Sequence, residues 1–382
     1  MALPLQAPCR PGLALSSAMY EWLDSPAAFE AALASLDAGS RASDDLARVG
    51  LDTEFMRVNT FYPELALVQL GRPNEVAWLI DPKPCAPLDA LGALLRSPAC
   101  VKIMHSASED LVALAPISQA PLAALFDTQI AAAFAGLGAG LGYQKLVQLE
   151  LGVEIEKGET RSDWLRRPLS ADQLRYAAID VLHLPALHDA LLGRLDQRNM
   201  LDWCQEDCDR LAQGFDADDP QPHLSFTALS KAPVDQQARL RRLLLWRDAL
   251  ARRIDRPRQW IFDNAQATSL IETPPDQLAA LTARLTGARS FPKRELGSLF
   301  ELLGAPLSAD ELLLPPIPAP IRGEAERTFK ALRERVNARA IELDLPPGLL
   351  ASRRVLEAQV RGERPPELDG WRGQVLGQAL EG

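Results

Sequence analysis

The feature that most constrains the fold is residues 49–56, Val-Gly-Leu-Asp-Thr-Glu-Phe-Met. Apolar or β-branched residues fill every second position, which predicts a β-strand. Side chains alternate between the faces of a strand, so Asp52 and Glu54 share one face while Thr53 and Phe55 point into the core. Adjacent carboxylates repel each other unless a cation lies between them, and oxygen ligands suit Mg²⁺ or Mn²⁺. An edge strand with two solvated acids explains these residues equally well, because Asp-x-Glu is a weak motif.

Length and charge set limits on the class of protein. A chain of 382 residues exceeds the usual size of one hydrophobic core, so we expect two or three domains. The net charge of −10 argues against a simple electrostatic nucleic-acid binder. It leaves a nucleic-acid enzyme open, because a metal site concentrates carboxylates and basic patches can be local.

The cysteines and the N-terminus indicate a cytoplasmic location. Five scattered cysteines, an odd number, are typical of reduced intracellular thiols. No apolar run reaches the ~18 residues that a membrane span needs. Prolines interrupt the apolar N-terminus, and it lacks the basic start of a secretory signal, so we predict a disordered extension over 1–19.

The first half of the chain predicts a mixed α/β sheet with helices on its faces. The strand with Asp52 is expected to begin the sheet and to form a three-stranded antiparallel meander with the next two strands. We predict further strands at 65–70, 76–80, 100–104 and 124–127, and helices at 27–36, 88–95, 108–114 and 128–134. Helical patterns follow from 143, including one long helix over about 170–192 and another to about 213.

A polar, proline-punctuated stretch at 214–222 marks a domain boundary. Everything beyond it has helical periodicity, and a second proline cluster at 306–320 separates two helical segments. The two segments resemble a diverged repeat. Each contains an Asp-x-Pro turn, at Asp255 and Asp344, and a later Pro-Pro pair.

Two further carboxylates lie where strands and helices meet. Asp110 falls in the first turn of a predicted helix, where the dipole favours an acid and where Ser108 has the place of an N-cap. Ordinary helix-start chemistry explains Asp110 equally well on its own. Tyr176 and Asp180 are four residues apart, so they share one helix face.

Together these acids match the needs of a metal-dependent nuclease. Two divalent cations ~3.5–4 Å apart require about four negative ligands, activate water and hold the leaving oxygen of a phosphodiester. Asp52, Glu54, Asp110 and Asp180 are the candidate ligands. The phenol of Tyr176 has an ordinary pKa near ~10, so we assign it orientation of the attacking water before general-base duty.

This ordered set of motifs resembles the ribonuclease D family, 3′→5′ exonucleases of the DEDD class with a tyrosine in the third motif. The resemblance extends over about 20–192 and includes the segments 126–129 and 157–169. It implies an α/β RNase H-like mixed-sheet nuclease domain, which we place at 20–213. The helical segments resemble HRDC domains, so two small all-α HRDC-like domains are expected at 223–303 and, more diverged, at 322–382.

Basic residues supply candidate RNA contacts. Lys157 and Arg161 are placed to grip phosphate or the leaving oxygen, although surface ion pairs are equally consistent with them. Residues 239–258 hold eight arginines against two aspartates, a positive stripe able to follow a phosphate backbone. A solubilising helix face with internal ion pairs is the alternative. The nucleic-acid-binding candidates in this stripe are Arg239, Arg241, Arg242, Arg252 and Arg253.

The sequence therefore predicts a metal-dependent 3′→5′ exoribonuclease that uses two Mg²⁺ or Mn²⁺ ions and releases nucleoside 5′-monophosphates. The resemblance implies RNA with a free 3′ end as partner, chiefly tRNA precursors and other structured RNAs. Asp52, Glu54, Asp110, Tyr176 and Asp180 are the expected catalytic residues. Two alternatives stay open at this point: a DNA 3′→5′ exonuclease of the same chemistry, and a non-catalytic RNA-binding protein.

Overall fold

The structure is a computed structural model, and it describes residues 19–40, 47–73, 76–156, 158, 162–214 and 219–380. The extension expected at 1–19 lies outside these residues except for Met19. Within them, no helix is both long enough and apolar enough to cross a membrane.

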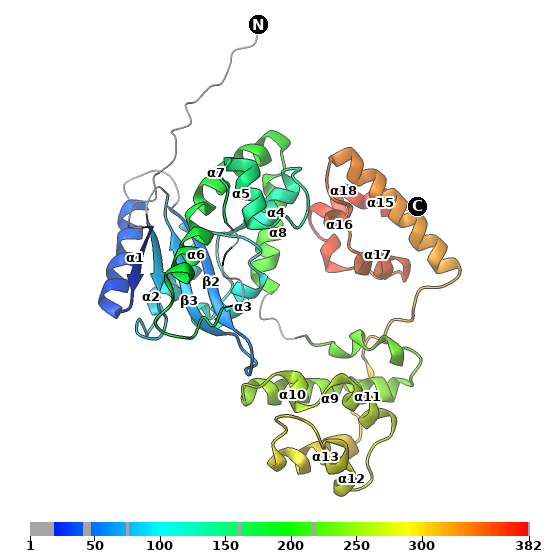
Figure 1. The fold of residues 1–382 in the computed structure, drawn as a ribbon. Helices are drawn as coiled ribbons and strands as arrows, with labels where there is room; N and C mark the ends of the chain where they lie inside the picture. The colour runs from blue at the N-terminus through cyan, green and yellow to red at the C-terminus, as the bar shows by residue number, and fades with distance from the viewer. Residues whose placement is uncertain are drawn as a thin grey trace.

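A six-stranded mixed sheet forms the centre of the first domain (Figure 1), with the spatial order β1-β4-β3-β2-β5-β6. Its strands are β1 (Tyr20–Leu23), β2 (Ala47–Met56), β3 (Glu64–Gly71), β4 (Ala77–Ile80), β5 (Cys100–Met104) and β6 (Leu125–Asp127). Strands β2, β3 and β4 form the predicted antiparallel meander, and the other pairs are parallel.

The prediction that the strand with Asp52 begins the sheet was wrong. Strand β1 precedes it and pairs in parallel with β4 at the sheet edge. With only four residues, β1 is too short to show a clear alternation in the sequence, and its pairing with a distant strand defines it.

Eight helices accompany the sheet within the described residues: α1 (Pro26–Ser40), α2 (Asp89–Arg96), α3 (Ser108–Ser118), α4 (Thr128–Phe134), α5 (Tyr143–Leu151), α6 (Ala171–Leu182), α7 (Leu184–Arg198) and α8 (Leu201–Gly214). The single long helix predicted over about 170–192 is in fact two, α6 and α7. Pro185 lies in the first turn of α7, and a proline there starts a new helix because its ring prevents continuation of the preceding one.

Two glycines allow α6 to lie directly on the sheet. Gly50 of β2 and Gly71 of β3 are register partners. A Cβ atom at Gly50 would lie 2.8 Å from the carbonyl oxygen of Val181, and one at Gly71 would lie closer still. Only glycine permits this approach. The contact fixes the height of α6 over the sheet and brings Asp180, the neighbour of Val181, close to Asp52 of β2.

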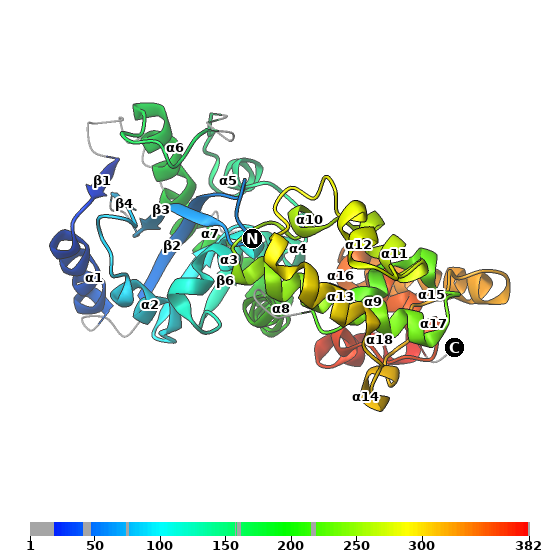
Figure 2. The same ribbon diagram turned by 90° about the horizontal axis from the view of Figure 1, so that it is seen from below.

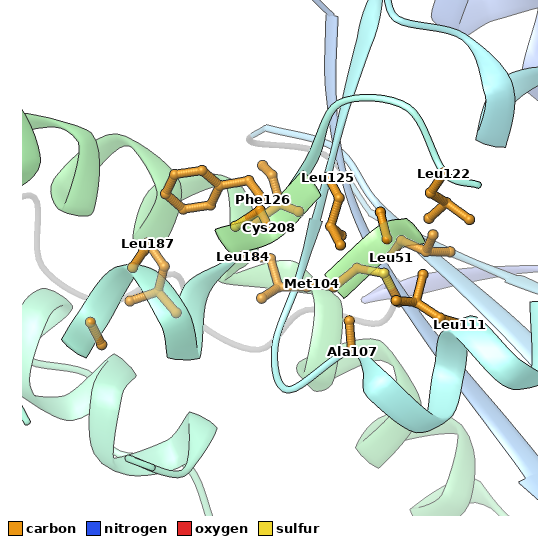
Figure 3. Packing of buried hydrophobic residues seen from close by; sticks show 14 of the residues in the cluster. Leu51, Met104, Ala107, Leu111, Leu122, Leu125, Phe126, Leu184, Leu187 and Cys208 are labelled. Atoms are coloured by element: carbon orange, nitrogen blue, oxygen red, sulfur yellow. The ribbon is translucent and has the colours of Figure 1, made fainter. Parts of the chain in front are cut away.

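The other face of the sheet carries α2 and α3 (Figure 2). Leu51 of β2 packs there in a buried cluster with Met104 of β5 and Leu111 of α3 (Figure 3). Removing such side chains from water is the main driving force that holds α3 on the sheet. Leu111 adjoins Asp110, so this packing also sets the position of the candidate acid.

The helical half contains two modules whose first three helices have similar lengths, 20, 4 and 9 residues in the first module and 20, 4 and 8 residues in the second. Each begins with a 20-residue helix, which is followed within two residues by an aspartate with positive φ: Asp255 (φ 48°) and Asp344 (φ 51°). The first module contains α9 (Val234–Arg253), α10 (Arg258–Ile261), α11 (Asn264–Glu272), α12 (Leu278–Arg284) and α13 (Leu296–Gly304), followed by α14 (Ala309–Leu312). The second contains α15 (Glu324–Leu343), α16 (Pro347–Leu350), α17 (Arg353–Val360) and α18 (Trp371–Leu380).

The two aspartate turns both contact the nuclease domain, at different places. The carboxylate of Asp255 accepts the backbone N–H groups of Phe61 and Tyr62, at 2.9 and 3.1 Å, in the turn that follows β2. The carboxylate of Asp344 accepts a hydrogen bond of 2.9 Å from Arg198 at the end of α7. An aspartate turn thus contacts the nuclease domain in each module.

The second module also shares a hydrophobic cluster with the nuclease domain. The indole of Trp371 stacks on Trp203 of α8, with ring centroids 4.9 Å apart, and donates to the carboxylate of Asp207 at 3.1 Å. Arg372 donates two hydrogen bonds to the same carboxylate. The first module instead has a cluster of its own, against which Phe61 packs.

Candidate active site

Three carboxylates meet between β2 and α6. Asp52 and Glu54 extend from one face of β2, as strand alternation predicts, and Asp180 extends from α6 above them. One oxygen from each side chain lies within 4.8 Å of one from each of the others. This arrangement has the donor atoms and the spacing that a divalent cation requires.

Burial and mutual repulsion favour the protonated forms of these acids in the absence of a cation. Burial, followed by the charges of the neighbouring acids, raises the pKa of Asp52 well above its usual value. The same causes raise the pKa of Glu54 to about 9. Burial likewise raises the pKa of Asp180 to about 7, although a hydrogen bond from Tyr176 opposes the shift. Cations would neutralise this cluster and allow all of the acids to ionise.

Asp110, at the start of α3, is not part of this 4.8 Å group of acids, but its charge helps to raise the pKa of Asp52. Its carboxylate accepts a hydrogen bond of 2.5 Å from the hydroxyl of Thr53. Burial raises the pKa of Asp110 to about 6, while the Thr53 bond acts in the opposite direction. The expectation that Thr53 only anchors the strand in the core was incomplete, because this buried side chain also fixes the orientation of Asp110.

Asp127 holds the segment that leads into α3. Its carboxylate caps α4, as expected for an acid at that place, and also accepts bonds from the turn before α3. The four donors are the backbone N–H groups of Gln129, Ile130, Ser106 and Ala107. The prediction of Ser108 as an N-cap was wrong: the cap position is Ala107, and no side chain caps it. The backbone N–H group of Ala107 at the start of the helix instead donates to Asp127, which is distant in sequence.

Tyr176 is held rigidly beside Asp180. The phenol hydrogen-bonds to the Asp180 carboxylate, and burial together with this charge raises the pKa of Tyr176 above its usual value. Its ring faces the buried ring of Trp164, with centroids 6.1 Å apart, and the backbone of Gly158. A Cβ atom at Gly158 would lie 2.8 Å from Cε2 of the tyrosine and closer still to Cδ2. The neutral phenol therefore has a fixed position.

The five arginines predicted to bind RNA all make contacts within the chain. Arg239 donates to the carbonyl oxygens of Leu303 and Ala305, and Arg241 donates to that of Pro220. Arg242 pairs with Glu311, and Arg253 pairs with Glu295. Arg252 lies over the ring of Phe61. These contacts support the alternative of internal ion pairs, and RNA binding by the stripe stays a prediction. Lys157 and Arg161 lie outside the described residues.

One polar contact near the acids was missed from the sequence. Arg57 directly follows β2 and forms an ion pair of 3.1 Å with Glu109, the neighbour of Asp110 in α3. It is the basic residue nearest in sequence to Asp52 and Glu54 on their C-terminal side. A lone arginine at a strand end carries no sequence signal of function, because surface arginines are common. The fold alone places it beside the first turn of α3.

Comparison with known families agrees with this geometry. Residues 20–196 match the 3′-5′ exonuclease family, and residues 236–287 match the HRDC domain. The fold and the acid cluster thus define a 3′→5′ exonuclease with an RNase H-like mixed sheet, followed by a helical HRDC region, as the sequence predicted.

Relatives that match over most of their length identify the family within this class of exonucleases. Ribonuclease D of Xanthomonas oryzae is 46% identical over 333 residues, which is 86% of this chain and 91% of that protein. Ribonuclease D of Pseudomonas paraeruginosa is 34% identical over 87% of this chain and 90% of its own length. The crystal structure of Escherichia coli RNase D, described as an exoribonuclease involved in structured RNA processing, superposes with a TM-score of 0.79 at 28% identity, over 94% of this chain and 97% of that chain. The chain belongs to the ribonuclease D family and is a 3′→5′ exoribonuclease.

Proposed function

We propose that the enzyme holds two divalent cations, Mg²⁺ or Mn²⁺, with the carboxylates of Asp52, Glu54, Asp110 and Asp180. The observation that carries this proposal is the convergence of three carboxylates within 4.8 Å, with the buried Asp110 adjacent. Like charges at such spacing in a partly buried site are unfavourable without a compensating cation. When bound, the cations activate a water molecule and neutralise charge on the phosphodiester.

Within this scheme Tyr176 orients the attacking water. Its hydroxyl is fixed by the bond to Asp180, and its raised pKa keeps the phenol protonated at neutral pH. A protonated phenol both donates and accepts hydrogen bonds, which suits it to position a water without removing a proton. Attack at the terminal phosphodiester releases a nucleoside 5′-monophosphate and a shortened RNA with a new 3′-hydroxyl.

We further propose tRNA precursors and other structured RNAs with free 3′ ends as substrates, and the cytoplasm as the location. The E. coli relative, which is described as acting in structured RNA processing, supports the substrate class. The HRDC match supports a module that holds the body of the RNA. Cys85, Cys204 and Cys208 are free thiols, which is consistent with a reducing compartment.

The test compares the purified wild-type enzyme with Asp180→Asn. Asp172→Asn is the matched control, because it changes an exposed acid in the first turn of the same helix. With Mn²⁺ and RNA carrying a 3′ overhang, wild type and control should release 5′-mononucleotides at similar rates. Asp180→Asn should lose at least ~100-fold while it binds RNA with the same affinity. Undiminished cleavage by Asp180→Asn would remove this residue from the metal site.

The choice of nucleic acid needs a separate comparison. A DNA overhang of the same sequence should be degraded more slowly than the RNA, because the 2′-hydroxyl distinguishes the two at the site of attack. Equal rates would favour the DNA exonuclease alternative. A precursor tRNA trimmed no faster than an unstructured RNA would remove the proposed preference for structured substrates.

A further inference from the structure

The middle of the sheet contains a buried side-chain amide without a hydrogen-bond partner among the described residues. Gln69 of β3 is 0% exposed, and neither its side-chain nitrogen nor its oxygen has a hydrogen-bond partner in the described part of the chain. Leaving a buried polar group unsatisfied costs ~1–3 kcal/mol. Buried polar groups without a partner are therefore rare in native proteins, unless the group has a partner under other conditions.

The register of the sheet places this amide beside the metal site. Gln69 is the direct partner of Asp52 across the antiparallel β2–β3 pair. Direct partners point to the same face, with Cβ atoms ~4.5–5.5 Å apart. Two residues further along β3, Gly71 lies beneath Val181 of α6 on this same face. The Gln69 side chain is thus enclosed between the sheet and α6, next to the Asp52 carboxyl group.

The chemistry of the two groups is complementary. A side-chain amide carries two N–H donors, and an ionised carboxylate offers about four acceptor positions. A carboxylate that binds a cation through one oxygen keeps acceptor positions for a neighbouring donor. Carboxylates that ligate metals are themselves held by such hydrogen bonds, which fix their orientation.

We propose that Gln69 is a positioning residue of the metal site: its amide N–H donates to the Asp52 carboxylate when cations are bound and fixes that ligand in its binding orientation. This inference rests on the proposed function, because it assigns Asp52 as a metal ligand. The amide acts through Asp52 and touches neither the RNA nor the reacting atoms.

The proposal makes two predictions of opposite sign for Gln69→Leu. Leucine has a similar size and no polar atoms, so the metal-free protein should be as stable as wild type or more stable. The affinity for Mn²⁺ should fall by ~10–100-fold, the usual effect of losing a hydrogen bond to a metal ligand. A glutamine needed only to complete the fold would give the reverse result, with lower stability and unchanged affinity.

Gln237→Leu is the matched control. Gln237 is also a buried glutamine, but its amide donates to the carbonyl of Ala232 and accepts from the N–H of Ile317 in the first helical module. Its replacement should lower stability, because two hydrogen bonds are lost, and should leave the affinity for Mn²⁺ unchanged.

The experiment measures Mn²⁺ binding to the full chain by isothermal titration calorimetry, and the denaturant midpoint in EDTA. A Gln69→Leu variant that binds Mn²⁺ as tightly as wild type would overturn the proposal, and so would one whose metal-free midpoint falls. Wild type and Asp180→Asn separate this failure from that of the proposed function. If wild type binds no Mn²⁺, or Asp180→Asn binds it equally well, the metal site itself is wrong.

Discussion

The contact between Gly158 and Tyr176 leads to a prediction about catalysis. Gly158→Ala would place a methyl group against the tyrosine ring, 2.8 Å from Cε2 and closer to Cδ2, whereas ordinary contacts begin at 3.4 Å. Either the ring or the backbone of residue 158 must therefore move by more than about 0.6 Å. Trp164 lies close to the same ring and is itself buried, so it restricts the space into which the ring can move.

The expected loss follows from the geometry of the water-orienting hydroxyl. A displacement of ~1 Å in a catalytic group can cost ~100-fold in rate. We therefore expect the turnover rate of Gly158→Ala to fall by ~10–100-fold. The affinity for RNA should change little, because the proposed role of the Tyr176 hydroxyl is to orient the attacking water. In a Tyr176→Phe background the same substitution should cost little more, since the hydroxyl that it misplaces is already absent.

Single-turnover cleavage of an RNA labelled at its 5′ end measures the chemical step, and filter binding measures the affinity for RNA. Gly193→Ala in α7 is the control, because a Cβ atom there meets nothing within 4 Å. It should leave the rate unchanged. The reasoning fails if Gly158→Ala cleaves at the wild-type rate, or if its loss is the same with and without the Tyr176 hydroxyl.

Two further predictions concern stability and docking. The folded protein raises the pKa of Glu54 to about 9 and that of Asp180 to about 7, so it binds more protons than the unfolded chain above about pH 4. The denaturant midpoint of the metal-free protein should therefore fall as the pH rises from 5 to 9. Saturating Mn²⁺ should flatten this pH profile. A flat metal-free profile would contradict the buried cluster. Asp255→Ala removes the acceptor for the N–H groups of Phe61 and Tyr62, so hydrogen exchange at these two amides should accelerate. Asp255→Asn keeps an acceptor and tolerates positive φ, so it should retain part of the protection. Unchanged exchange in Asp255→Ala would show that the contact does not hold the module in solution.

Local periodicity was enough to predict most of the elements and which of the candidate site residues share a face. Strand β5 and helix α4 have the predicted bounds, because each is a short apolar segment between clear breaks. The shared face of Asp52 and Glu54 follows from the two-residue period of a strand, and that of Tyr176 and Asp180 from the 3.6-residue period of a helix. Such relations depend only on backbone geometry over a few residues, so they can be derived directly from the sequence.

The contacts that complete the site were decided by the tertiary structure. Thr53 meets Asp110 across 57 positions of sequence, and Gln69 lies beside Asp52 through strand register. Neither relation has a sequence period, because it depends on which segments pair and how closely they pack. The arginines of α9 show the same limit: their spacing predicts a basic stripe, but carbonyl and carboxylate partners elsewhere in the fold bind them. The sequence by itself determined which groups are available for catalysis. Long-range packing determined how these groups are oriented and which arginines have partners within the chain.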